Sequence, residues 1–360
     1  MDNVSPMTHH LIIRIHIDPT LGLGHLTRAL AIYEEWKLLG GKTTLVVSGD
    51  ERAREVGRGK NILSGELPPE IIDLGENSFA PLGKTMKGEV VLFDQWTSSR
   101  EQIKEAHPRK IALMEDDGDA YEEPDLLFQP YLEGIVWPDH PTRTKNGIKL
   151  KPHEDIRGKC HVLCGATYIV ASPIVRTLRP KRQPDQPLNA QKILVTFGGS
   201  DAMGLAQKAF DILKNLQQEG RWRGSSVILA PQGIRGDSFP GCTVHTSMTQ
   251  LSEKIQQFDV IWCAGGVTLI DALCLGIPVV AWGQNERQVQ GLTELGHHGS
   301  CFGLGEGPSA DPQTVQDALE HWLGPEGQES RQEQVAAGMA LIDGLGATRV
   351  AKELWKLAEK

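Results

Sequence analysis

The sequence predicts an α/β protein built from two doubly wound, parallel-sheet domains, and three observations support this fold class. Short apolar runs alternate with segments of helical periodicity along most of the chain. The alternation stops in a proline-rich stretch at 172–191 and then starts afresh. Glycine-containing turns follow several of the apolar runs, as is typical of connections from a strand to a helix.

The first half supplies six candidate strands and one clear helix. The helix is predicted over 25–40, where Leu26, Leu30, Tyr33 and Trp36 recur at spacings of three and four and so share one face. A pair of glycines marks its end. The candidate strands are 11–17, 43–49, 70–75, 90–94, 110–115 and 126–130.

The second half repeats the pattern more cleanly. Strands are predicted at 192–197, 226–230, 259–263 and 278–283, with an amphipathic helix over 205–216. The stretch 172–191 carries four prolines without periodicity, so it is the candidate linker. We therefore expect an N-terminal Rossmann-like domain at 1–175, a second at 190–345 and a C-terminal helix at 346–360.

Composition limits the classes of partner. The net charge of -9 and the lack of a basic run leave nothing to neutralise a nucleic-acid backbone. The longest apolar runs are too short to cross a bilayer, and the first residues lack a signal-peptide layout. Six scattered cysteines are typical of reduced thiols. We expect a cytoplasmic protein, monomeric or weakly homodimeric, that binds neither nucleic acid nor a membrane.

Three glycine turns are candidate phosphate sites, because each opens a predicted helix after a strand. They are "GLGH" at 22–25, "GGSD" at 198–201 and "AGGVT" at 264–268. A helix N-terminus holds an anion with its unpaired N–H groups, and glycine allows close approach. Taken singly, each of these sequences is equally typical of a tight strand-to-helix turn that binds no ligand. Together they favour a phosphate-bearing ligand, although none is a P-loop or a complete G-x-G-x-x-G fingerprint, so a nicotinamide cofactor is not expected.

Two further clusters raise the question of a metal. The acidic run "EDDGD" at 115–119 has carboxylates at alternate positions, and "CHVLC" at 160–164 brings together two thiols and an imidazole. No second pair of ligands follows the cysteines at a usable spacing, and acidic runs are usually solvated loops. We expect no metal and no cofactor.

A family resemblance rests on four stretches in order: "RIHIDPTLGLGHLTRALAI", "VTFGGSDAMGLAQKAFDIL", "FDVIWCAGGVTLIDALCLGIPVVAW" and "LIDGLGATRVAKEL". Together with "DDGDAYEEPDLLFQP" and "CGATYIV" they resemble the UDP-sugar hydrolases of pseudaminic acid biosynthesis and their spore-coat polysaccharide relatives. That family is similar in turn to GT-B glycosyltransferases. The resemblance implies a GT-B-like fold, with two Rossmann-like domains facing a cleft and UDP on the second.

The resemblance also implies site residues. His25 would activate the water that attacks the anomeric carbon, and the first turn of a helix suits a neutral base. Asn285 would act beside it, and Asp271 would hold the ribose hydroxyls where the family usually has glutamate. Expected substrate-binding residues are Gly22, Gly24, Asp94, Trp96, Gly198, Gly199, Ser200, Asp201, Gly265, Gly266, Val267, Thr268, Asp271 and Gln288. The alternatives are a packing role for His25 and a surface turn for Asn285.

One departure concerns the sugar. The family has an Asp-His-Tyr stretch after the strand at 90–94, whereas this chain has Asp94, Gln95 and Trp96. An indole can stack on a sugar but has no oxygen to accept a hydrogen bond. The substrate sugar is therefore open.

Three functions remain possible at this stage. The leading interpretation is metal-independent hydrolysis of a UDP-sugar at C1. The alternative is a GT-B glycosyltransferase that deprotonates an acceptor hydroxyl instead of water. A non-catalytic nucleotide-sugar-binding protein is the third, and the presence of His25 argues against it; an epimerase is a weaker relative of the first.

Overall fold

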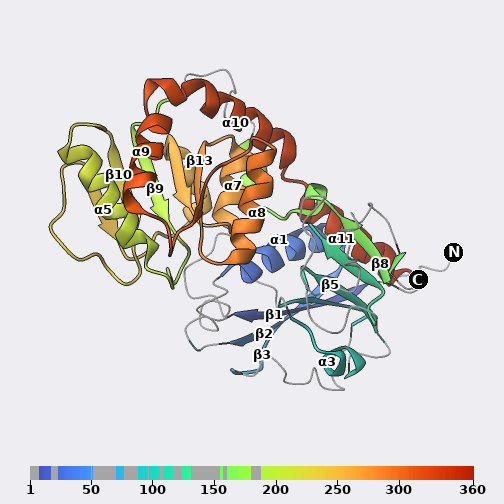
Figure 1. The fold of residues 1–360 in the computed structure, drawn as a ribbon. Helices are drawn as coiled ribbons and strands as arrows, with labels where there is room; N and C mark the ends of the chain where they lie inside the picture. The colour runs from blue at the N-terminus through green and yellow to red at the C-terminus, as the bar shows by residue number, and fades with distance from the viewer. Residues whose placement is uncertain are drawn as a thin grey trace, which may run out of the picture. The chain divides into compact units, whose positions relative to one another are not determined.

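The computed structural model describes residues 8–17, 23–49, 51, 70–76, 88–95, 97–105, 109–116, 123–130, 155–156, 160–179 and 188–360. The chain divides into two compact units (Figure 1). The first unit combines Met1–Pro173 with the C-terminal Leu345–Lys360, and the second is Ile174–Gly344. The chain therefore leaves the first unit and returns to it at its end.

The first unit is a doubly wound α/β domain, as predicted. Its eight-stranded sheet has the order β3-β2-β1-β4-β5-β6-β8-β7, and all neighbouring pairs are parallel except β7 with β8. The strands are β1 His10–Ile17, β2 Lys42–Gly49, β3 Glu70–Asp73, β4 Val90–Asp94, β5 Lys110–Met114, β6 Leu126–Gln129, β7 Asp155–Ile156 and β8 Cys160–Cys164. The helices are α1 Gly24–Leu38, α3 Arg100–Glu105 and the C-terminal α11 Gly346–Ala358.

Helix α1 and the C-terminal helix α11 pack against the same face of this sheet (Figure 1). The predicted face of α1 is buried, with Trp36 fully inaccessible and Tyr33 nearly so. Helix α11 contributes Val350 and Leu354 to the same core. Gly346 allows this approach, because a Cβ there would lie 1.9 Å from the carbonyl oxygen of Ile169.

The second unit repeats the architecture. Its six-stranded sheet is parallel throughout and has the order β11-β10-β9-β12-β13-β14. The strands are β9 Lys192–Thr196, β10 Ser225–Leu229, β11 Cys242–His245, β12 Val260–Cys263, β13 Val279–Gly283 and β14 Phe302–Glu306. The helices are α4 Val175–Leu178, α5 Leu205–Gln218, α6 Leu251–Lys254, α7 Val267–Leu275, α8 Glu286–His297, α9 Pro312–Leu323 and α10 Gln328–Leu341.

Each sheet contains a point at which the strand order reverses. In the first unit the chain winds outward from β1 to β3, then returns to place β4 on the other side of β1. In the second unit β9 and β12 are the corresponding neighbours. Ligands of open α/β sheets bind at the carboxyl ends of strands at such a point. The two reversal points are therefore where sites are expected.

The sequence missed several elements. Strand β8 covers the segment considered above as a metal cluster, and β11 and β14 are edge strands with only partly buried side chains. The half-exposed β11 and β14 give weak periodicity, which explains their omission. Strand β8 is buried, but its two cysteines and its histidine favour a metal-ligand interpretation of the sequence over a strand. None of the helices in the described ranges has the length and apolar composition to span a bilayer.

Candidate active site

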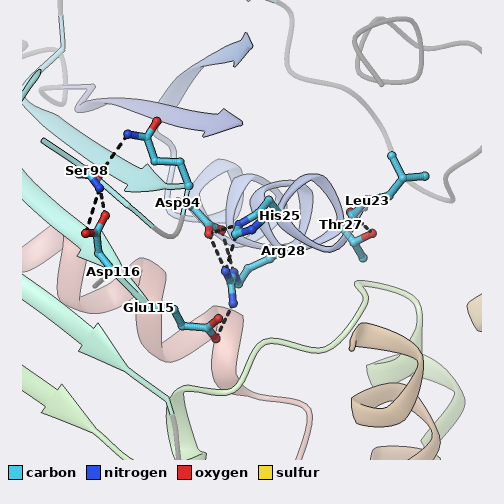
Figure 2. Close-up of polar contacts among 9 residues, drawn as sticks. Leu23, His25, Thr27, Arg28, Asp94, Ser98, Glu115 and Asp116 are labelled. Carbon is cyan, nitrogen blue, oxygen red and sulfur yellow. Dashed lines mark hydrogen bonds and ion pairs between the residues drawn. The ribbon is translucent and has the colours of Figure 1, made fainter. Parts of the chain in front are cut away.

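Two predicted site residues of the first unit, His25 and Asp94, are in direct contact. His25 lies in the first turn of α1, and Asp94 is the last residue of β4, next to β1 at the reversal point. The imidazole Nδ1 is 2.6 Å from Asp94 Oδ1 (Figure 2). Both side chains are buried, with 3% of His25 and none of Asp94 exposed. A carboxylate only accepts, so Nδ1–H donates to Asp94 and the basic lone pair is on Nε2.

Arg28, which the sequence analysis did not single out, completes the arrangement. It lies three residues after His25 on α1 and holds Asp94 with two hydrogen bonds, Nε to Oδ2 at 2.7 Å and Nη2 to Oδ1 at 2.5 Å. Its third nitrogen, Nη1, is 2.5 Å from Glu115 Oε1, just beyond the end of β5. Figure 2 shows Arg28 between the two carboxylates.

The charges in this cluster are strongly stabilised. Burial by itself would raise the pKa of Asp94, but Arg28 and His25 outweigh it and lower that pKa to about 2. Burial likewise disfavours the guanidinium, yet Asp94 and Glu115 raise the pKa of Arg28 well above its usual value. Asp94 therefore stays ionised near neutral pH. Arg28 Nη2 is also 3.3 Å from His25 Nδ1, but the shorter bond to the carboxylate decides the tautomer.

The start of the acidic run has structural partners. Glu115 binds Arg28, and Asp116 accepts from the backbone N–H of Ser98 at 3.1 Å and from its hydroxyl. Asp117, Gly118 and Asp119 lie outside the described residues. Among the residues that are described, no group of three or more histidine, cysteine, aspartate or glutamate side chains is placed to hold a metal ion.

In the second unit the predicted "GGSD" turn joins β9 to α5. Gly198 has a φ of 92°, which favours glycine, and none of the described atoms lies within 4 Å of where a Cβ would stand. Asp201 accepts from the backbone N–H groups of Leu205 and Ala206 at 2.9 and 3.0 Å. Its carboxylate therefore occupies the N-terminus of α5. Because the Asp201 side chain is engaged in this way, only its backbone could contact a phosphate.

The "AGGVT" turn between β12 and α7 is different. Gly266 is the N-cap of α7, no side chain among the described residues caps the helix, and its first turn contains no acidic residue. A Cβ on Gly266 would meet no atom of the described residues within 4 Å, so there is space in front of the N-cap position. Of the two turns in this unit, it retains the partial positive charge that attracts an anion.

Asn285 and Gln288 take part in the start of α8. Asn285 is the N-cap, and its Oδ1 accepts from the backbone N–H of Gln288 at 3.0 Å. Gln288 Oε1 accepts from the N–H of Gln284 at 2.9 Å, and a Cβ on Gly265 would lie 3.3 Å from Gln288 Cβ. The structure thus brings Gln288 to the β12–α7 turn. The "NERQ" pattern is a capping-box signature that would have revealed this role.

Gln284 and Gln232 are further polar residues at this sheet edge. Gln284 Nε2 donates to the carbonyl of Phe197 at 3.0 Å, and Gln232 Nε2 donates to the carbonyls of Ser200 and Asp201 at 3.3 and 3.4 Å. They connect the turns after β10 and β13 to the turn that contains Gly199. The β9–α5 turn is therefore held from two sides.

The remaining predicted residues are placed as follows. Gly24 is the first residue of α1, and Asp271 lies on α7 with 1% of its surface exposed. Gly22 and Trp96 lie outside the described residues. His25 and Asp94 belong to the first unit, and the residues from Gly198 to Gln288 belong to the second.

Comparison with known proteins agrees with this architecture. No protein-family model matches the chain. The spore coat polysaccharide biosynthesis protein SpsG of Bacillus subtilis is 22% identical over 291 residues, which cover 77% of this chain and 79% of SpsG. MurG of Acinetobacter baumannii matches with a TM-score of 0.61 and 11% identity, over 97% of this chain and 99% of MurG. The spinosyn rhamnosyltransferase SpnG gives a TM-score of 0.59 and 13% identity, over 97% of this chain and 100% of SpnG.

The chain has the GT-B fold. The predicted fold class is thereby confirmed, and the identities are too low to carry more than the fold. Within this GT-B chain, each candidate region lies at the strand reversal of its own sheet. The first unit presents a buried histidine–carboxylate pair there, and the second presents a helix N-terminus that no described side chain caps.

Proposed function

We propose that this protein transfers a sugar from a nucleoside diphosphate sugar, with UDP as the nucleotide, to an acceptor hydroxyl. The observation that carries the proposal is the 2.6 Å contact of His25 Nδ1 with the ionised Asp94. It leaves Nε2 as a base whose conjugate acid is stabilised by the carboxylate. The likeness to GT-B glycosyltransferases supports transfer over other chemistry.

The proposed reaction is a displacement at C1 of the sugar. Nε2 of His25 takes the proton of the acceptor hydroxyl as its oxygen attacks C1, and the bond from C1 to the diphosphate oxygen breaks. The electron pair leaves with UDP. Backbone N–H groups at the start of α7, after Gly265 and Gly266, are the proposed donors to the growing charge of the diphosphate. Asp271, Asn285 and Gln288 stay candidates for the ribose and sugar.

Hydrolysis of the same donor is the second candidate. Only 3% of the His25 side chain is exposed, and so restricted an approach favours a nucleophile as small as water. The SpsG relative is named for polysaccharide biosynthesis, which fits either reaction. The proton and electron movements are the same, with water in place of the acceptor.

The test uses the full-length protein and a panel of UDP- and TDP-sugars, with and without EDTA, followed by NMR. Release of UDP and free sugar without an acceptor establishes hydrolysis. Binding of one donor, with release only when a sugar or lipid-linked hydroxyl is added, establishes transfer. Failure to bind any nucleotide or nucleotide sugar contradicts the proposal.

A further inference from the structure

The histidine–aspartate pair is part of a larger buried cluster. His25 and Arg28 come from α1, Asp94 from the end of β4 and Glu115 from just beyond β5. Asp94 Oδ1 lies 2.6 Å from His25 Nδ1 and 2.5 Å from Arg28 Nη2, so one oxygen serves both. Glu115 touches the far side of Arg28 at 2.5 Å. The exposed fractions of Arg28 and Glu115 are only 12% and 15%.

We propose that Arg28 and Glu115 are positioning residues for the base: Arg28 orients Asp94 toward His25, and Glu115 balances the charge of Arg28 so that His25 can accept a proton. The reaction in which the base acts rests on the proposed function. The effect of both residues on His25 itself does not, and it can be measured without turnover.

Arg28 acts first through geometry. Its planar fork reaches both oxygens of Asp94, with Nε on Oδ2 and Nη2 on Oδ1, and this bidentate pairing fixes the carboxylate plane. With that plane fixed, Oδ1 points at His25 Nδ1 and the proton is held on Nδ1. A lysine has the charge but not the fork, so it cannot orient Asp94 in the same way.

Glu115 acts through charge. With a neutral imidazole, two carboxylates and one guanidinium leave the cluster with one net negative charge. Protonation of His25 makes it neutral. Without Glu115 the same step would convert a neutral cluster into a cationic one, which is costly for buried groups. Glu115 thereby favours the arrival of a proton on His25 through its contact with Arg28.

The backbone of Glu115 agrees with this role. Its φ is 52°, in the left-handed region that non-glycine residues rarely adopt, while its N–H still donates to the carbonyl of Phe128 at 2.9 Å. A strained non-glycine residue persists only where its surroundings hold it in place. In this conformation the Glu115 side chain contacts Arg28.

Other charged groups lie near α1 but are engaged elsewhere. On α11, Arg349 donates to the carbonyl of Thr167 and Glu353 pairs with Lys356. On β1, Arg14 and His16 alternate with the core residues that face α1, so they lie on the opposite side of the sheet, where His16 contacts Ser48. On β2 the charged residue is Lys42, at the strand's other end.

The test is 15N NMR of the histidines, with His25 assigned by its loss in His25→Gln. The wild type is expected to show the tautomer with the proton on Nδ1. In Arg28→Met, which removes a cation 3.3 Å from Nδ1, the ratio of protonated to neutral His25 at pH 6.5 should rise at least about fivefold. In Glu115→Gln, which keeps an oxygen acceptor for Arg28, the ratio should fall by a similar factor.

Glu320→Gln is the matched control. It removes a glutamate 2.6 Å from Arg221 in the second unit and should leave His25 unchanged. Arg28→Lys should keep the protonation ratio near wild type but lose the single tautomer. Unchanged His25 signals in a folded Glu115→Gln protein, or a change in the same direction as in Arg28→Met, would overturn the inference. If Arg28→Met does not fold, the protonation ratio of His25 in Glu115→Gln is sufficient to test the inference.

Activity supplies a separate outcome. If His25 responds as expected and a donor is turned over, Glu115→Gln should lower kcat with little change in KM, because the proposal has Glu115 act through Arg28 and not on the substrate. If His25 responds but the wild type turns over no nucleotide sugar, the proposed function fails while the charge coupling stands.

Discussion

Asp94 Oδ1 lies 2.6 Å from His25 Nδ1, although 69 positions separate the two residues in the chain. Adjacent parallel strands create this proximity, since β1 leads to the helix of His25 and β4 ends at Asp94. The pairing sets the tautomer of the imidazole, with the proton on Nδ1. The first two predictions below, for His25→Ala and Asp94→Asn, depend on this contact.

His25→Ala should abolish turnover and leave nucleotide binding nearly intact. A general base contributes about 10²–10⁴-fold to the rate, whereas the proposed nucleotide donors lie in the other unit. Donor turnover measured by UDP release and UDP affinity measured by calorimetry separate the two effects. A loss of UDP affinity as large as the loss of turnover would contradict the assignment of His25 as the base.

Asp94→Asn should flatten the dependence of stability on pH in the acid range. The folded-state pKa of Asp94 is about 2, against 3.8 for an unperturbed aspartate. A depressed carboxyl pKa stabilises the fold above the unfolded value, and this contribution, about 2 kcal/mol, is lost as pH falls from about 4 through 2. Urea unfolding at pH 7, 4 and 3 should therefore show a steeper decline for the wild type.

The control for that series is Asp317→Asn. Asp317 is an exposed carboxylate 2.6 Å from Arg221, and solvent screening makes such pairs weak. Its pH dependence should stay close to that of the wild type. Parallel curves for the wild type and Asp94→Asn would show that Asp94 is not ionised by its partners as described.

The sequence predicts the sheets better than the sites. Runs such as 90–94 are buried on both faces of a parallel sheet, so they are continuous and easily recognised. The position of the C-terminal helix α11 is harder to predict from the sequence than the strands are. It depends on contacts with α1, which lies more than 300 residues earlier in the chain. No local pattern encodes such a partner.

The site shows the same limit. Arg28 stands in the stretch "GHLTR" at helical spacing from His25, so their common face is visible in the sequence. The partners of Arg28 are not visible in the sequence. Asp94 and Glu115 come close to Arg28 only because β1, β4 and β5 are neighbours in the sheet. Asn285 is the opposite case, since its capping role is local and the sequence already contains the signature.

Gly266→Val should weaken nucleotide binding and leave the fold unchanged. Gly266 has extended backbone angles, φ −124° and ψ −163°, and a Cβ would meet no atom of the described residues within 4 Å, so we expect valine to be tolerated. Its side chain would fill the space before the N-terminus of α7. We expect the Kd for UDP to rise by about tenfold or more, equivalent to about 1.4 kcal/mol.

Gly291→Val is the control for Gly266. Gly291 lies on α8, where an added Cβ would likewise meet no atom in the described ranges within 4 Å, but it lies inside its helix, beyond the first turn. The variant should bind UDP like the wild type. Equal UDP affinities in both variants would exclude the α7 N-terminus as the diphosphate site.

Gln129→Met should stabilise the protein. Gln129 is the last residue of β6 and 6% exposed, and neither atom of its amide has a hydrogen-bond partner in the described part of the chain. A buried amide without partners costs about 1–3 kcal/mol, which an apolar side chain of similar shape avoids. Gln102→Met is the matched control, because Gln102 Oε1 accepts from Gln95 Nε2 and from the N–H of Ser99 at 2.9 Å.

The two glutamine variants should change the melting temperature in opposite directions. A lower value for Gln129→Met would mean that its amide is hydrogen-bonded in solution. A gain in stability accompanied by a loss of donor turnover would instead assign the amide to the substrate.

Gly346→Ala should destabilise the first unit by detaching α11. The added Cβ would lie 1.9 Å from the carbonyl oxygen of Ile169, closer than any real contact, so either the helix or the segment at Ile169 must move. Overpacking of this kind costs about 1–3 kcal/mol. Gly291→Ala makes the same chemical change within α8, where the site is open, and should gain about 1 kcal/mol from helix propensity. Hydrogen exchange should locate the loss in Gly346→Ala to α11 and to its partner α1. Equal stability of the two alanine variants would mean that the close approach of α11 to Ile169 does not hold this helix on the sheet.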